Sequence, residues 1–140
     1  MFLIGCSTSA RQAHTCRTIA ALNPVTRAQF RLALFRIETD WYQLAEQYDA
    51  EGDRKLSSKS RKLLRESILA SVDLFAAKPY FLSDDFSLVD CSIAPILWRM
   101  PAYGIELGMQ AEPIEAYMKR VFERRSFQES LTELEQEMRL

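Results

Sequence analysis

The residues best placed for chemistry are a serine and an aspartate in the stretch FSLVDCSIAP, where Ser87 precedes an apolar run and Asp90 follows three residues later. An aspartate inside an apolar run is either a catalytic carboxylate or part of a helix cap. In a capping box the serine hydroxyl accepts the amide of the third helical residue, and the acidic side chain accepts the amide of the serine. The spacing predicts that Ser87 and Asp90 cap a helix.

A catalytic role for Asp90 would need a partner that exchanges protons, either a second carboxylate or a histidine. The single histidine, His14, is distant in sequence, and the neighbouring Asp84 and Asp85 belong to the turn before the predicted cap. We therefore favour the structural interpretation of Asp90 and predict no catalytic residue.

The three cysteines form no recognisable disulfide framework or metal pattern, and their odd number fits a reducing cytosol. Cys6, His14 and Cys16 supply soft ligands, but a fourth ligand is missing and the spacing matches no common zinc finger. We predict no metal site and no cofactor. Cys91 is expected on the buried first turn of a helix, as a packed thiol and not as a nucleophile.

The composition indicates one soluble, mostly helical domain. The chain has 140 residues, 48% of them hydrophobic, and only 4 glycines and 5 prolines for tight turns. Its net charge of -1 argues against a protein that mainly grips phosphate backbones, so direct nucleic-acid binding is not expected. No apolar run approaches the length of a membrane span, and the start MFLIGC lacks the features of an export signal. We expect a cytoplasmic protein.

Apolar residues recur at helical spacing after Pro24, whereas residues 1–23 show no sustained period and are expected to form an irregular leader. Residues 24–140 are predicted to form an all-α bundle of about five helices. The expected helices run from Thr26 to about Ala50, from Ser58 to Ala77, from Ser87 to near Gly104, from Pro113 to about Arg124, and over a short terminal segment.

Within this bundle, the helix that begins at Ser87 is apolar on several sides and should be the most buried one. Trp41 lies on the apolar stripe of the first helix, so we interpret it as core and not as a ligand platform. The terminal segment carries two successive capping-box patterns, which are Ser126 with Glu129 and Thr132 with Glu135.

One side of the second predicted helix is basic. It carries Lys59, Arg61, Lys62 and Arg65, and no aromatic residues alternate with them as base stacking would require. We interpret these residues as a solvated face, and the alternative is contact with an acidic patch on another protein.

The stretch FSLVDCSIAP resembles the capping box that opens the central buried helix in the C-terminal domain of the glutathione transferase family. The longer stretches RIETDWY, KPYFLSDDFSLVDCSIAPILWRMPAYGIEL and YMKRVFERRSFQESLTELEQEMRL are similar to a bacterial branch of this family. The resemblance covers about residues 24–140. It implies a stress-responsive transcription regulator that associates with the RNA polymerase holoenzyme, forms a homodimer and has no transferase activity.

In this family the first two helices of the domain face the dimer partner, so the resemblance places Arg27, Arg31 and Phe35 on a possible dimer or partner surface. Family members begin with a thioredoxin-like domain, but this sequence has no βαβ pattern and we expect no such domain in it. The family's polymerase-facing proline-histidine-proline loop is also absent from the sequence. Two alternatives stay open, a truncated helical domain without independent activity and a remnant glutathione transferase.

Overall fold

The computed structural model describes residues 23–50 and 56–139. Within these residues the chain forms helices and no strand, and an isolated β-bridge joins Tyr80 to Ser83. The predicted all-α fold class is confirmed. Residues 1–22 of the expected leader, including the group of Cys6, His14 and Cys16, lie outside the described residues.

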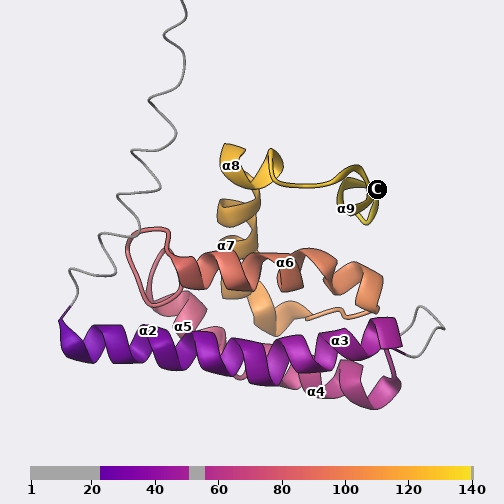
Figure 1. The fold of residues 1–140 in the computed structure, drawn as a ribbon, viewed down its shortest axis with the longest axis horizontal. Helices are drawn as coiled ribbons and strands as arrows, with labels where there is room; N and C mark the ends of the chain where they lie inside the picture. The colour runs from indigo at the N-terminus through magenta and orange to yellow at the C-terminus, as the bar shows by residue number, and fades with distance from the viewer. Residues whose placement is uncertain (1–22, 51–55, 140) are drawn as a thin grey trace, which may run out of the picture.

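A long helical rod lies along one side of the molecule in Figure 1. Its consecutive parts are α2 (Pro24–Arg36), the π-helical turn η1 (Ile37–Tyr42) and α3 (Gln43–Ala50). Phe30, Ile37 and Trp41 face the core from this rod, and the Trp41 indole donates to the Ser67 hydroxyl at 2.9 Å. The interpretation of Trp41 as a core residue is confirmed.

Polar side chains shape both the start and the middle of the rod. Asn23 caps the start, because its side chain accepts the Thr26 amide at 2.9 Å. The sequence patterns predicted the rod but not its wider π-helical middle. There the Thr39 hydroxyl donates at 2.9 Å to the Phe35 carbonyl, which is the acceptor that the Thr39 amide would use in a regular α-helix.

The second predicted helix is interrupted, so the expectation of one helix from Ser58 to Ala77 was wrong. The structure has two helices there, α4 (Ser58–Leu69) and α5 (Val72–Ala77). At the break the Ser71 hydroxyl donates to the Ser67 carbonyl at 3.3 Å, and the Ser71 amide reaches Ile68 instead of Ser67. A serine side chain that competes for a helical carbonyl favours such an interruption.

The central helix is α6 (Leu88–Tyr103), which lies between the rod and the C-terminal helices in Figure 1. It packs against α2, η1, α3 and α7 (Glu112–Phe122), and it is the most buried helix, as predicted. Pro101 lies inside it and has no amide hydrogen, so the Leu97 carbonyl lacks its helical donor. The Arg139 guanidinium donates to that carbonyl at 2.9 Å instead.

The segment after α6 contains the 3-10 turn η2 (Met109–Ala111), then α7, α8 (Arg125–Gln128) and α9 (Glu133–Glu137). The capping box of Thr132 and Glu135 opens α9, as the sequence predicted. The box predicted for Ser126 and Glu129 was wrong, because α8 already begins at Arg125 and the Glu129 carboxylate pairs with that arginine at 2.6 Å. None of the helices in the described part of the chain is long and apolar enough to cross a bilayer.

Candidate functional site

The Asp90 carboxylate is completely buried at the start of α6 and joins three parts of the fold. Its Oδ2 accepts from the Ser87 amide at 2.8 Å and from the Ser87 hydroxyl at 3.0 Å. Its Oδ1 accepts from the Phe81 amide at 3.0 Å and from the Tyr117 hydroxyl at 2.7 Å. The carboxylate thus ties the loop before α6 and the middle of α7 to the first turn of α6.

Ser87 is the N-cap of α6, and the structure contains the complete capping box with Asp90. The Ser87 hydroxyl also accepts the Val89 amide at 3.3 Å. Burial, followed by the nearby Asp90 charge and the hydrogen bond to it, raises the pKa of the Tyr117 phenol, so this hydroxyl stays protonated and keeps donating.

The chemistry open to Asp90 is limited by these bonds. A carboxylate has about four acceptor positions, and its four donors fill them. The donors are the Ser87 amide, the Ser87 hydroxyl, the Phe81 amide and the Tyr117 phenol. This arrangement orients a helix and leaves no free oxygen to take a proton from a substrate.

Cys91 follows Asp90 but is exposed, so the expectation that it lies on a buried turn was wrong. The first turn of α6 buries Val89 and Asp90 and turns Leu88 and Cys91 outward. Partial burial of the sulfur and the charge of Asp90 raise the pKa of the Cys91 thiol. A raised pKa disfavours the thiolate, which is the nucleophilic form of cysteine.

The outward side of α2 carries apolar residues that the fold leaves uncovered within the described chain. Val25, Leu32 and Phe35, which we call the α2 stripe, are 69%, 54% and 62% exposed. Their spacing places them along one side of the helix, whereas Phe30 faces the core. Arg27 and Arg31, which the resemblance places on the same partner surface as Phe35, are also exposed.

No group of three or more histidine, cysteine, aspartate or glutamate residues that could hold a metal ion occurs within residues 23–50 and 56–139. The Cys6, His14 and Cys16 group, which we predicted to form no metal site, falls outside those ranges.

Sequence reasoning did not find all partners of Asp90. Ser87 was visible because it is three residues away and follows a known capping pattern. Tyr117 is 27 residues away on another helix, and Phe81 contributes a backbone amide that any residue type could supply. The only local sign was that a buried carboxylate at Asp90 would need several donors.

The described residues form a helical domain around the capped central helix α6. Most of the chain matches a known family. Residues 17–125 match the family described as glutathione S-transferase, C-terminal domain. The chain belongs to this family. The match begins inside the segment for which residue patterns indicated only an irregular leader.

Similarity to individual proteins narrows the family further. The chain is 47% identical over 109 residues to the stringent starvation protein A homolog of Haemophilus ducreyi, covering 77% of this chain and 51% of that protein. Identity to the homolog of Pasteurella multocida is 48% over 109 residues, with the same coverage, 77% and 51%. The Coxiella burnetii homolog is 39% identical over 117 residues, covering 83% of this chain and 56% of that protein. The chain therefore spans about half the length of these curated relatives.

Proposed function

We propose that this chain is a cytoplasmic, RNA polymerase-associated regulator of stress-responsive transcription that acts through protein contacts and without catalysis. The observation that carries the proposal is its 39–48% identity to proteins named stringent starvation protein A homolog. The family resemblance in RIETDWY and in the segments around α6 and α9 implies the association with polymerase.

Two features of the structure support a role in contacts between proteins. The α2 stripe is apolar and exposed, and Arg27 and Arg31 are exposed on the same helix. Apolar cores with arginine among their enriched residues are typical of protein interfaces. The buried carboxylate of Asp90, by contrast, has its acceptor positions filled by hydrogen bonds that hold the fold together.

We also propose that the chain forms a homodimer through the α2 stripe of each copy. If the α2 stripes of two chains packed against each other, Leu32 and Phe35 of both chains would be buried. Phe35→Asp should therefore shift the chain from dimer to monomer in sedimentation-velocity runs. Met109→Asp is the matched control, because Met109 is 99% exposed and lies outside the stripe. A dimer that persists in Phe35→Asp would contradict this assignment.

The test of the functional proposal is co-elution of the purified chain with RNA polymerase holoenzyme on a sizing column, first at low and then at moderate salt. We expect co-elution at low salt, weakened at moderate salt if charged residues contribute. A folded, helical chain that elutes separately from the polymerase at both salt concentrations would contradict the proposal.

A further inference from the structure

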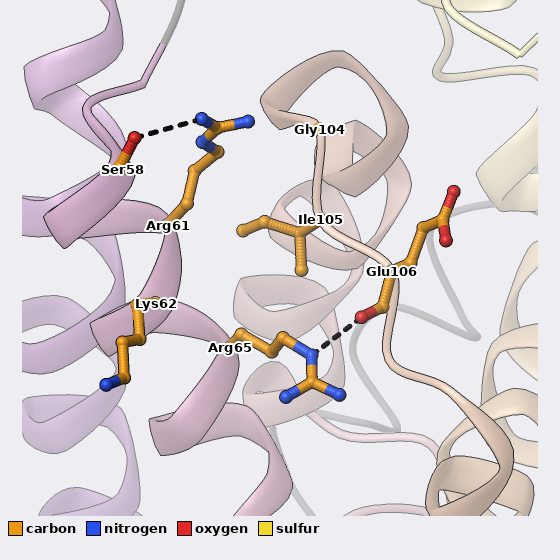
Figure 2. Close-up of a pocket in the computed structure, with 7 residues that line it drawn as sticks. All are labelled: Ser58, Arg61, Lys62, Arg65, Gly104, Ile105 and Glu106. Atoms are coloured by element: carbon orange, nitrogen blue, oxygen red, sulfur yellow. Dashed lines mark hydrogen bonds between the residues drawn. The ribbon is translucent and has the colours of Figure 1, made fainter.

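A pocket of about 350 Å³ lies between α4 and the segment that follows α6. From α4 it is lined by Ser58, Arg61, Lys62 and Arg65, and from the other side by Gly104, Ile105 and Glu106. Figure 2 shows the two arginine side chains reaching from α4 toward the facing segment, with Ile105 between them. The pocket is therefore basic on one wall and apolar in its middle.

The charges around the pocket are poorly balanced. Neither Arg61 nor Arg65 forms an ion pair with any residue that the structure describes. Lys62 lies 3.9 Å from Glu66, and both side chains are largely exposed, so this pair neutralises little. The Glu106 carboxylate points away from the arginines in Figure 2, and its backbone carbonyl accepts from Arg65 Nε at 2.7 Å. The guanidinium groups of Arg61 and Arg65 thus line the pocket, and no carboxylate of the described residues pairs with either of them.

The Arg65 guanidinium is held in place by two hydrogen bonds, and the Arg61 guanidinium is held less firmly by one. Arg65 donates to the carbonyls of Glu106 and Leu107, at 2.7 Å and 3.0 Å. Arg61 donates to the Ser58 hydroxyl at 3.3 Å and lies close to Gly104, where a Cβ would come within 3.1 Å of its Nη1. A guanidinium has five N–H donors, so each arginine keeps donors for a ligand. Ordered donors lose less entropy when they bind.

The donors of the pocket indicate which kind of anion it would take. Sites that cradle a phosphate usually aim free backbone amides at it. Here the Gly104 and Ile105 amides donate to the Pro101 and Met100 carbonyls, each at 3.0 Å, and so end α6. The pocket also has no aromatic side chain on which a base could stack. Guanidinium forks around an apolar centre instead match carboxylates carried on a peptide.

We propose that this pocket docks an acidic segment of a protein partner. Arg61 and Arg65 are four residues apart on α4, so their side chains are neighbours on one side of the helix. Two carboxylates separated by one helical turn of the partner would each meet one guanidinium, and an apolar side chain between them would meet the edge of Ile105, which is 5% exposed. This proposal rests on the proposed function and specifies which chemical groups the protein partner presents. Its test uses no polymerase.

The test is fluorescence anisotropy of the full chain with a labelled helical peptide of about 15 residues that has two glutamates four positions apart and a leucine between them. The same peptide with glutamines is the control. We expect the glutamate peptide to bind and the glutamine peptide to bind at least about fivefold more weakly. Added salt should weaken the binding of the glutamate peptide. Equal binding of the two peptides, or no binding, overturns the proposal.

Arg61→Gln is the informative variant, because the hydrogen bond from Arg61 to the exposed Ser58 is long, at 3.3 Å, and its loss should leave the fold intact. We expect this variant to bind the glutamate peptide about fivefold more weakly than the wild type and to keep the melting temperature of the wild type. Lys119→Gln removes an exposed cation of α7 outside the pocket and should bind like the wild type. Lys62→Gln serves as a second pocket variant. Unchanged affinity in both pocket variants would overturn the proposal, as would inorganic phosphate that displaces the peptide more effectively than free glutamate does.

Failure of this proposal and failure of the proposed function give different results. Peptide binding without polymerase co-elution would keep the pocket and reject the polymerase as partner. Co-elution that is unchanged by Arg61→Gln, with no peptide binding, would keep the polymerase association and reject the pocket.

Discussion

Replacing Asp90 by asparagine exchanges one carboxylate oxygen for an NH2 group and keeps the size of the side chain. In the wild type, Oδ2 accepts from the Ser87 amide and hydroxyl, and Oδ1 accepts from the Phe81 amide and the Tyr117 hydroxyl. An amide nitrogen can replace only one of these oxygens. In either orientation of the asparagine side chain, one buried backbone amide then faces another donor, and one hydroxyl must turn round to accept from the new NH2 group.

The magnitude follows from the lost amide bond, from the weaker neutral bond of the hydroxyl and from the donor left without an acceptor. A hydrogen bond to a charged group contributes roughly 1.5–3 kcal/mol, and donors left unsatisfied in the interior cost free energy as well. Asp90→Asn should therefore lower the free energy of unfolding by about 3 kcal/mol. Tyr117→Phe removes one of the same hydrogen bonds and should cost about 1.5 kcal/mol.

Urea unfolding followed by circular dichroism measures these losses. Asp73→Asn is the matched control, since Asp73 is exposed on α5 and the change should stay within about 0.5 kcal/mol. Because Asp90 and Tyr117 are in direct contact, the double variant should lose less than the sum of the two single losses. A loss below about 1 kcal/mol in Asp90→Asn would refute the view that this carboxylate holds three elements together.

The other predictions concern the C-terminal helix and the exposed cysteine. Arg139→Ala removes two 2.9 Å bonds to α6 carbonyls and two ring contacts, so it should lower stability by about 2 kcal/mol in thermal unfolding, whereas an unchanged melting temperature would contradict the bridging role. The Arg99 hydrogen bond holds the pKa of Glu135 below its ordinary value of 4.5, so its stabilisation is present above about pH 4.5 and is lost as pH falls through the lower folded pKa. The stability difference between the wild type and Glu135→Gln should therefore be about 0.5 kcal/mol at neutral pH and vanish in acid, and a difference that grows in acid would contradict this sign. Cys91 should react with iodoacetamide at neutral pH more slowly than a cysteine in an unstructured peptide, because burial and Asp90 raise its pKa above 9.0, and faster reaction would contradict this.

Short sequence patterns predicted where helices begin and end when the neighbouring residues alone determine it. Ser87 and Asp90 stand three residues apart before an apolar run, and this spacing is enough to predict a helix start. Pro79 likewise disfavours helical geometry in the residue before it, and α5 ends at Ala77. The interruption at Ser71 was missed, because a serine within a helical pattern can either point to solvent or compete for a carbonyl, and only packing decides.

The binding surfaces depended on tertiary structure and could be predicted only in part. Arg61 and Arg65 were recognised as basic residues of the second helix, but the pocket exists only because Gly104 to Glu106 lie against them. Cys91 shows the same limit. Its position in an apolar run suggested burial, yet the first turn of a helix has one side that faces outward, and the sequence does not say which side α7 will cover.

The affinity of fluorescently labelled chain for RNA polymerase holoenzyme, titrated to saturation at low salt, is the decisive measurement for a regulator that acts through protein contacts. We predict saturable binding that Phe35→Asp or Arg61→Gln weakens and that Met109→Asp leaves unchanged, since Met109 is exposed outside the α2 stripe and the pocket. Absence of saturable binding by a chain shown to be folded and helical would contradict the proposed function.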